Sequence, residues 1–448
     1  MSENTHSDTK MVQPELKRLS DMLLELDDML VSCMRCGFCM AVCPVFGVTM
    51  QEADVTRGKI SLLENLARHM INDPEAVNEK LNRCLLCGSC QMACPSGVKV
   101  MDIFLRARSI VTGYMGLSPI KKLIFRSLLV RPGLFDSLIG MSAMFQGLFL
   151  KKTSDVVGTS CAPLLSPLIG NRHFPSLPKR SFTSRMPSRD SAPGKSGIKV
   201  AFFPGCVSDK LFAHVAEAAI KVLELHGVGV FMPPNQSCCG IPALASGDRQ
   251  SYDRLVRNNL KLFGDGSFDY LITPCATCTS TIKEFWPKLT EDYTPGEKEQ
   301  ITALQGKAMD LVAFLVDVLK VDLPQASGGE KRVTYHDSCH LKKSLKVTEQ
   351  PRQVLKGLPG YTFVEMAEAD RCCGSGGSFT LSHSDLSAQI GQRKRNNIVA
   401  VKPDVVAAAC PACMLQLMDM LSRNQDDIPV RHVVELYLEA VESGRASV

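Results

Sequence analysis

The sequence predicts an α+β multidomain protein, in which a helical N-terminal domain is followed by two copies of an α/β domain. Three observations lead to this prediction. Two cysteine motifs of the form C-x2-C-x2-C-x3-C-P begin at Cys33 and Cys84, and the segment between them has helical periodicity. The second half of the chain repeats a pattern of five cysteines, with corresponding cysteines 133 to 135 residues apart. In both copies, short runs rich in β-branched and aromatic residues precede the cysteines.

The spacing of the two N-terminal motifs is the one by which bacterial ferredoxins hold [4Fe–4S] clusters. Three thiolates in one tight loop reach three irons of a cubane, and the fourth cysteine of such a motif ligates the other cluster when two are present. Zinc, which prefers two separated cysteine pairs, is the disfavoured alternative. The two predicted ligand sets, each drawn from both motifs, are Cys33, Cys36, Cys39 and Cys94, and Cys84, Cys87, Cys90 and Cys43.

Length and composition restrict the class of protein. A chain of 448 residues is long enough for two or three domains. It contains 19 cysteines, yet the stretch before Ser20 has neither an apolar signal-peptide core nor a twin arginine, so we expect a cytoplasmic protein with reduced, metal-binding cysteines. The formal net charge is +5, and residues 151–195 hold eight Lys and Arg against two Asp. The rest of the chain is close to neutral, which argues against a nucleic-acid-binding face.

Helical patterns dominate the predicted N-terminal domain, residues 1–112. Pro14 begins an amphipathic helix whose leucines recur at steps of three and four residues as far as Leu30. Between the motifs, apolar residues from Ile60 to Met70 follow the period of a helix that stops near Asp73. A compact ferredoxin would have β-hairpins here, so we expect an α-helical ferredoxin-like domain with two clusters.

Residues 113–197 are predicted to form a helical segment and then a linker. The helical pattern between Met101 and Leu150 is unusually apolar and is interpreted as packing between domains. The alternative is a peripheral contact with a partner subunit or with the inner face of the cell membrane. Asp136 and several glycines interrupt its most apolar stretch, which is therefore not predicted to span a membrane. Residues 171–197, rich in Pro, Ser, Arg and Lys, are predicted to be an extended linker.

Two α/β domains are predicted over residues 198–325 and 326–448. Each group of cysteines lies just beyond the carboxyl end of a predicted strand, where open α/β sheets place their ligands. The predicted strands are Lys199–Phe203, Val228–Met232 and Tyr270–Thr273 in the first copy, and Val333–Tyr335, Thr362–Glu365 and Val405–Ala408 in the second. The candidate metal ligands are Cys206, Cys238, Cys239, Cys275 and Cys278 in the first copy, and Cys339, Cys372, Cys373, Cys410 and Cys413 in the second.

These two patterns, C-x31-CCG-x34-C-x2-C and C-x32-CCG-x35-C-x2-C, resemble the cysteine-rich CCG domains of heterodisulfide reductase and its relatives. A two-cluster ferredoxin domain followed by two CCG domains resembles the glycolate oxidase iron–sulfur subunit, and also lactate-utilisation and anaerobic glycerol-3-phosphate dehydrogenase iron–sulfur proteins. The resemblance covers nearly all the chain from about Met29. It implies a further iron–sulfur cluster in each CCG domain, of the non-cubane [4Fe–4S] type that heterodisulfide reductase holds. It also implies an FAD-containing dehydrogenase as partner subunit, and a quinone or another carrier as electron acceptor.

No nucleotide-binding motif accompanies the cysteines. The run Gly374-Ser-Gly-Gly377 lacks the Lys-Ser/Thr of a P-loop, and no G-x-G-x-x-G follows a predicted strand. We therefore expect that the chain obtains its electrons from a partner and does not oxidise 2-hydroxy acids alone. The partner would select the substrate, for which glycolate, D-lactate, L-lactate and glycerol 3-phosphate are the candidates.

Two functions remain after this comparison of motifs. The first is an electron-transfer subunit of a glycolate or lactate dehydrogenase complex. The second is a heterodisulfide-reductase-like subunit whose CCG clusters reduce a disulfide, which the full set of ten CCG cysteines keeps open. No catalytic side chain is predicted with certainty. His336 and His340 flank Cys339, and a hydrogen-bonding or structural role is preferred for both over ligation.

Overall fold

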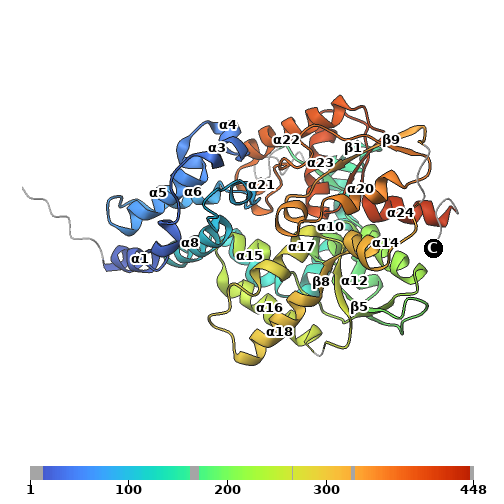
Figure 1. The fold of residues 1–448 in the computed structure, drawn as a ribbon, viewed down its shortest axis with the longest axis horizontal. Coiled ribbons are helices and arrows are strands. Elements are labelled where there is room, and N and C mark those ends of the chain that lie inside the picture. The colour runs from blue at the N-terminus through green and yellow to red at the C-terminus, as the bar shows by residue number, and fades with distance from the viewer. Residues whose placement is uncertain (1–13, 162–170, 265, 324–327, 444–448) are drawn as a thin grey trace, which may run out of the picture.

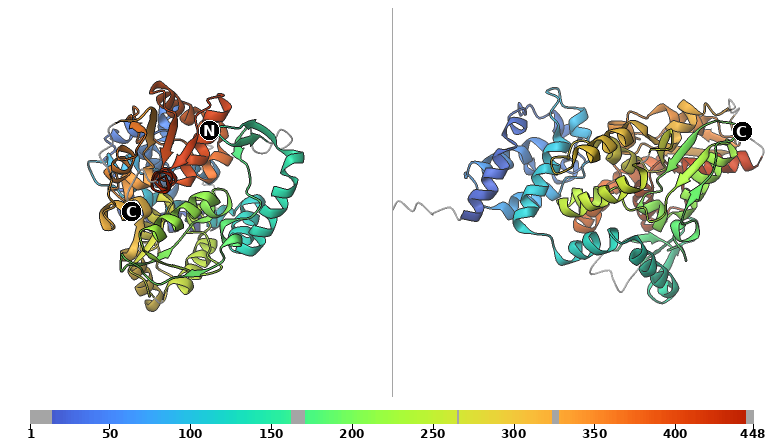
Figure 2. Two further views of the ribbon diagram at one scale, coloured as in Figure 1. Left: turned by 90° about the vertical axis from the view of Figure 1, so that its right-hand side faces the viewer. Right: turned by 90° about the horizontal axis from the view of Figure 1, so that it is seen from below.

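The computed structural model describes residues 14–161, 171–264, 266–323 and 328–443, with the backbone alone at 145 and 147–149. The N-terminal helical domain lies at one end of the molecule, and the two α/β domains lie side by side at the other (Figure 1). The segment between them stands out to one side of the α/β domains when the molecule is viewed end-on (Figure 2).

Between residues 14 and 115 the structure contains helices and no β-strand, as the helical periodicity predicted. The single helix expected from Pro14 to Leu30 is interrupted at residues 25–26, although Leu19, Leu23 and Leu26 are all buried as one face. This face packs against α5. The elements are α1 (Pro14–Leu24), α2 (Asp27–Leu30), α3 (Phe38–Val42), α4 (Phe46–Thr49), η1 (Glu52–Asp54), α5 (Thr56–Ala67), α6 (Pro74–Asn82), α7 (Ser89–Met92) and α8 (Val100–Met115).

A helical arm follows, made of α9 (Pro119–Leu123), the π-helical turn η2 (Ile124–Leu129) and α10 (Pro132–Phe149). One side packs on the protein through buried Phe125 and Ile139, whereas Ile120, Leu123 and Met144 are exposed. Packing between domains therefore accounts for only one side of this apolar segment. In the described part of the chain, no helix combines the length and the apolar character needed to cross a bilayer.

The segment predicted to be an extended linker is more structured than expected. Strands β1 (Lys151–Ser154), β2 (Thr159–Cys161) and β3 (His173–Pro175) form a small antiparallel sheet on the second α/β domain, followed by α12 (Phe182–Arg185) and β4 (Arg189–Asp190). The backbone N–H of His173 donates to the Asp419 carboxylate at 2.8 Å, and Arg172 forms an ion pair with the same side chain. The prolines of this segment suggested a flexible connection, but the backbone hydrogen bonds and these buried contacts fix it to both α/β domains.

The first α/β domain is a five-stranded sheet in the order β4-β6-β5-β7-β8, parallel except for β4. Helices cover both faces, and the three predicted strands are present within one or two residues. The elements are β5 (Lys199–Phe202), α13 (Cys206–Lys210), α14 (Ala213–Leu225), β6 (Gly229–Met232), α15 (Ile241–Ala245), α16 (Arg249–Phe263), β7 (Tyr270–Thr273), α17 (Ala276–Ser280), η4 (Thr281–Phe285), α18 (Pro295–Lys307), β8 (Ala308–Asp310), α19 (Leu311–Ala313) and η5 (Phe314–Val318).

The second α/β domain repeats this topology with a parallel sheet in the order β10-β9-β11-β12. Because β9 to β12 correspond to β5 to β8 in the same spatial order, the duplication inferred from the cysteines extends to the fold. The elements are β9 (Lys331–His336), η6 (His340–Ser344), α20 (Glu349–Lys356), β10 (Tyr361–Phe363), α21 (Ser378–Ser382), α22 (Ser384–Ala400), β11 (Val405–Ala408), α23 (Pro411–Arg423), β12 (Val430–His432) and α24 (Val433–Glu442).

Candidate metal centres

Every cysteine of the chain is a free thiol in the structure, and the 18 candidate ligands gather where the three domains meet. Cys161 is apart from them on β2 of the small sheet, as its isolated position in the sequence predicted. Most of the CCG thiols are buried. Buried thiols in such number, without disulfide bonds, suit a site in which metal replaces the thiol protons.

The first N-terminal set lies around one small cavity. The first three cysteines of motif one approach it from the loop before and the first turn of α3, and the last cysteine of motif two lies opposite. The cavity is lined by Cys33, Cys36, Cys39 and Cys94, and Cys90 also contributes to its wall. The structure thus brings together the four residues that the crossed assignment grouped. Cys36 is exposed, so this cavity is the one nearest to the protein surface.

The second N-terminal set lines a neighbouring cavity that is more deeply buried, formed by Cys43, Cys84, Cys87 and Cys90. Burial raises the pKa of Cys43 to about 11 and also raises the pKa of Cys90. Thiols of this kind ionise at neutral pH only when a cation stabilises the thiolate, so metal binding would displace their protons.

Two buried cations beside the second set were not predicted from the sequence. The Lys59 amine, on α5, donates to the backbone carbonyl of Asp54 and lies near Cys43 and Cys84. The Arg108 guanidinium, on α8, donates to the carbonyls of Cys84 and Ala245 at 2.7 Å each. Positive groups at this place offset the negative charge of a cluster held by four thiolates. A basic residue at a core phase of an otherwise apolar helical pattern is the signal that could have identified them.

The CCG cysteines extend from the carboxyl ends of the strands, as predicted. Cys206 begins α13 after β5, and its sulfur is 3.4 Å from that of Cys238. The double cysteine is followed in both copies by a glycine in the left-handed region, with φ of +96° at Gly240 and +91° at Gly374. A Cβ at Gly240 would come within 2.7 Å of the Tyr252 ring, so both backbone conformation and space require glycine after the two cysteines.

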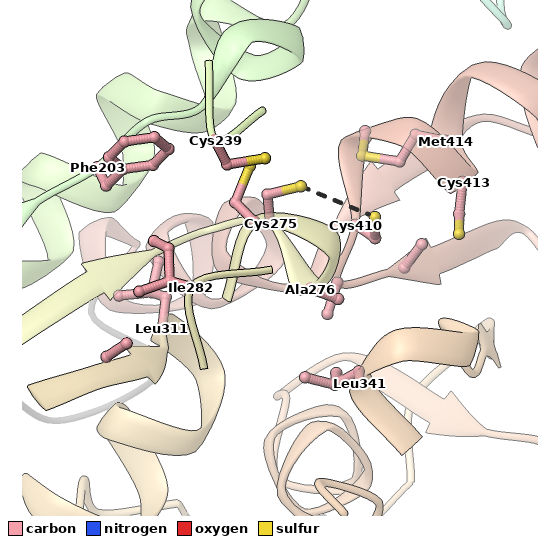
Figure 3. Close-up of a cluster of buried hydrophobic side chains, with 14 of the residues drawn as sticks. Phe203, Cys239, Cys275, Ala276, Ile282, Leu311, Leu341, Cys410, Cys413 and Met414 are labelled. Carbon is pink, nitrogen blue, oxygen red and sulfur yellow. Dashed lines mark hydrogen bonds between the residues drawn. The ribbon is translucent and has the colours of Figure 1, made fainter. Parts of the chain in front are cut away.

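The two CCG sets face one shared cavity of about 160 Å³ between the α/β domains. Nine of the ten CCG cysteines line this cavity, together with the glycines Gly376 and Gly377. The tenth, Cys410, lies beside the cavity with its sulfur 4.0 Å from that of Cys275 (Figure 3). This volume is many times the ~10–15 Å³ that a single water needs, so the space between the sets admits a larger group.

The second N-terminal set directly contacts the second CCG set. The thiols of Cys87 and Cys372 lie within hydrogen-bonding reach of each other, which is the largest influence raising the pKa of Cys87. His340 also joins the domains, because its ring nitrogens lie 3.1 Å from the Leu86 carbonyl and 3.3 Å from the Thr277 hydroxyl. His340 therefore has the structural role that the sequence favoured for it.

His336 lacks such partners. Its side chain is fully buried at the end of β9, and neither ring nitrogen has a hydrogen-bond partner among the described residues. One ring nitrogen and the sulfurs of Cys373 and Cys413 lie within 4.8 Å of one another. Burial, and secondarily the charge of Lys394, lowers the pKa of His336 to about 3. A hydrogen-bonding role with protein groups, preferred for His336 from the sequence, is not what the structure contains.

The fold and the four cysteine sets define an iron–sulfur protein, and comparison with known families agrees. Residues 29–98 match the family model of a 4Fe-4S dicluster domain, and residues 200–283 and 333–418 each match the CCG cysteine-rich domain. The chain is 30% identical to a probable glycolate oxidase iron–sulfur subunit of Bacillus subtilis over 97% of its own length and 98% of that protein. The chain belongs to the glycolate oxidase iron–sulfur subunit family.

Two shorter matches extend the comparison. Over 56% of the chain, the protein is 32% identical to the whole of lactate utilization protein A of Oceanobacillus iheyensis. Over 54% of the chain, it is also 32% identical to one of the polypeptides of a fumarate reductase (CoM/CoB) of Methanothermobacter marburgensis, of which the match covers 46%.

Proposed function

We propose that this protein is the electron-transfer subunit of a flavin-dependent 2-hydroxyacid dehydrogenase that acts on glycolate or lactate. It would receive electrons from the FAD of a partner subunit and deliver them to a quinone or another carrier. The relatives named for glycolate oxidase and lactate utilization support this class of complex. No nucleotide-binding motif occurs in the sequence, which supports the assignment of the acid-oxidising step to the partner.

The observation that carries the proposal is an unbroken series of four cysteine sets. Cys90 lines both N-terminal cavities, Cys87 meets Cys372, and Cys275 lies 4.0 Å from Cys410. Iron–sulfur clusters bound at these sets would supply one-electron transfer. Since each set touches the next, the chain would hold its clusters in one sequence from the N-terminal domain to the first CCG domain.

The proposed ligands follow this grouping. Two [4Fe–4S] cubanes would be bound by the first N-terminal set, Cys33, Cys36, Cys39 and Cys94, and by the second, Cys43, Cys84, Cys87 and Cys90. Each CCG set would bind one further cluster, of the non-cubane [4Fe–4S] type. A pair of adjacent cysteines does not easily ligate one iron of a cubane without backbone strain, but it can cap or bridge two irons of an opened cluster. The αL glycine that follows each pair gives the backbone the required turn.

Electrons would enter at the first N-terminal set. Cys36 is exposed there, and the surrounding surface includes Met34 and Phe38, which are 67% and 64% exposed. Exposed apolar side chains of this size mark contact sites for partners. The flavoprotein partner would therefore cover Met34 and Phe38 and bring its FAD close to the first cubane.

A second candidate function is disulfide reduction at the CCG clusters. It is favoured by the shared cavity, which is lined by cysteines of both CCG sets, and by the similarity to a polypeptide of the fumarate reductase (CoM/CoB). The two functions differ in the direction of electron flow. Disulfide reduction would consume electrons inside the cavity, whereas the dehydrogenase function passes them on to a diffusible carrier.

The test is reduction by substrate in the complex. The chain is purified anaerobically with its flavoprotein partner, and its clusters are followed by visible absorption and EPR after addition of glycolate or lactate. We expect cluster reduction in the complex and none in the isolated chain. The proposal is wrong if the isolated chain oxidises either acid with a dye as acceptor, or if the clusters stay oxidised in a complex whose FAD is reduced.

A further inference from the structure

The two CCG sites differ at one position beside the cysteines. His336 stands three residues before Cys339, and the same position of the first copy, three residues before Cys206, is Phe203. Both side chains are fully buried at the ends of corresponding strands. Phe203 packs its ring against Phe263, with centroids 6.1 Å apart, and contributes no polar atom. The second copy thus places an imidazole where the first has a hydrocarbon ring.

This imidazole is exceptional because both of its nitrogens lack partners among the described residues. Leaving one buried polar group unsatisfied costs about 1–3 kcal/mol, and a missing ion is one of the few explanations for such a group. One nitrogen of His336 lies within 4.8 Å of the sulfurs of both Cys373 and Cys413. The lone pair of a neutral imidazole is also a common ligand of iron.

We propose that His336 is a direct ligand of the cluster in the second CCG domain. One imidazole nitrogen binds an iron of the cluster held by the five cysteines of that copy, whereas the first CCG cluster is ligated by cysteine alone. The inference rests on the proposed function in one respect, namely that the second CCG domain binds an iron–sulfur cluster.

The consequence is a difference in potential between the two CCG clusters. Imidazole carries no negative charge, and replacement of thiolate by histidine in Rieske centres raises the reduction potential. We therefore expect the second CCG cluster to be reduced more readily than the first. This order suits its position, because Cys372 of the second copy is the CCG residue that contacts Cys87 of the N-terminal domain.

His340 provides a matched control within the same copy. It is four residues from His336 and lines the same cavity, but its two nitrogens already lie 3.1 and 3.3 Å from protein oxygens. A histidine with both nitrogens engaged has none left for iron, so His340→Gln should leave the cluster's nitrogen coordination unchanged.

The experiment uses the full chain, labelled with 15N-histidine and purified anaerobically. Electron–nuclear double resonance of the paramagnetic second CCG cluster should detect the strong coupling of a directly bound histidine nitrogen. In His336→Phe, which copies the first CCG site, that coupling should be lost and the midpoint potential of this cluster should fall. His340→Gln should keep the coupling. A histidine coupling that survives His336→Phe, or one no stronger than that of hydrogen-bonded amide nitrogens, overturns the assignment.

Iron analysis separates failure of this inference from failure of the proposed function. In the variant Cys372→Ser with Cys373→Ser, loss of one cluster's iron shows that the second CCG domain binds a cluster. If iron is lost there but the nitrogen coupling in the parent protein does not come from His336, only the histidine ligand is refuted. If no iron is lost, the proposed cluster itself is absent and both statements fail.

Discussion

At the scale of single residues, buried charges set the conditions around the cysteines. Lys59 is 1% exposed beside the second N-terminal set, and the neutral variant Lys59→Met removes a positive charge that favours the reduced, more negative cluster. We expect the midpoint potential of that cubane to fall by on the order of tens of millivolts, since one charge at effective ε ≈ 20 interacts over several ångströms with about a few kcal/mol. EPR-monitored redox titration measures the change. Lys80→Met, which removes a charge at the partly exposed edge of the same domain, should have a much smaller effect.

A buried ion pair holds the loop between His336 and Cys339. Arg352 donates two hydrogen bonds to the Asp337 carboxylate, at 2.9 and 2.7 Å, and Asp337 is 2% exposed. Arg352→Met leaves this carboxylate buried without its partner, which should destabilise the second CCG domain by about 3–5 kcal/mol. The measurement is urea denaturation of the anaerobic protein followed by far-UV circular dichroism.

Lys342→Met is the control for this prediction. The Lys342 amine lies 3.7 Å from the same carboxylate but is partly exposed, so its loss should cost no more than about 1 kcal/mol. Equal denaturation midpoints for Arg352→Met and the unmodified chain would show that Asp337 does not depend on the arginine.

At the scale of elements, the sequence predicted those with a strong local signal. Strands β7 and β11 have the predicted bounds because four consecutive β-branched or apolar residues lie directly before a cysteine. Strands β8 and β12 were not predicted, since each has only three residues and is stabilised by pairing with a neighbour distant in the chain. The same reason explains β4, where Arg189 and Asp190 have no strand preference of their own but pair through the backbone with β6.

The helical arm has exposed apolar and basic side chains on adjoining surfaces. Ile120 and Leu123 of α9 are exposed next to Lys122 and Arg126, the combination by which helices bind anionic lipid surfaces. We expect the double variant Ile120→Asp with Leu123→Asp to bind vesicles containing phosphatidylglycerol at least about tenfold more weakly, because burial of one such side chain contributes about 1.5–3 kcal/mol. Co-sedimentation measures the binding.

The control for the arm is Met70→Asp, which changes an exposed apolar residue beyond the end of α5. It should leave vesicle binding unchanged. If the parent chain does not bind the vesicles at all, or if the double variant in α9 binds them as well as the parent does, the exposed side of the arm faces a protein partner rather than lipid.

At the scale of the whole molecule, the sequence predicted the cysteine sets but not how they are joined. Motif spacing alone grouped the eight N-terminal cysteines correctly in space, because each motif folds as one local loop. Which CCG copy meets the N-terminal domain depends on how α8 and η6 pack, and neither has a motif that reveals it. The contacts of Cys87 with Cys372 and of His340 with Leu86 join residues distant in the chain. Such contacts follow from tertiary packing, which periodicity does not encode.

These contacts make the order of the clusters testable. The second CCG set contacts the N-terminal domain through Cys87, and the first CCG set is reached across the pair Cys275 and Cys410. Removing the second CCG cluster with Cys372→Ser and Cys373→Ser should therefore prevent or greatly slow reduction of the first CCG cluster by the partner and substrate. Removing the first with Cys238→Ser and Cys239→Ser should leave reduction of the second unchanged.

Rapid-freeze EPR of the two variants in the complex measures this asymmetry. In both, the signals of the two N-terminal cubanes should appear at the unmodified rate, because these sets precede either CCG site in the series. If the first CCG cluster is reduced equally fast without the second, electrons reach it by a separate route from the N-terminal domain. The contact between Cys87 and Cys372 would then be structural, and the two CCG domains would act in parallel rather than in series.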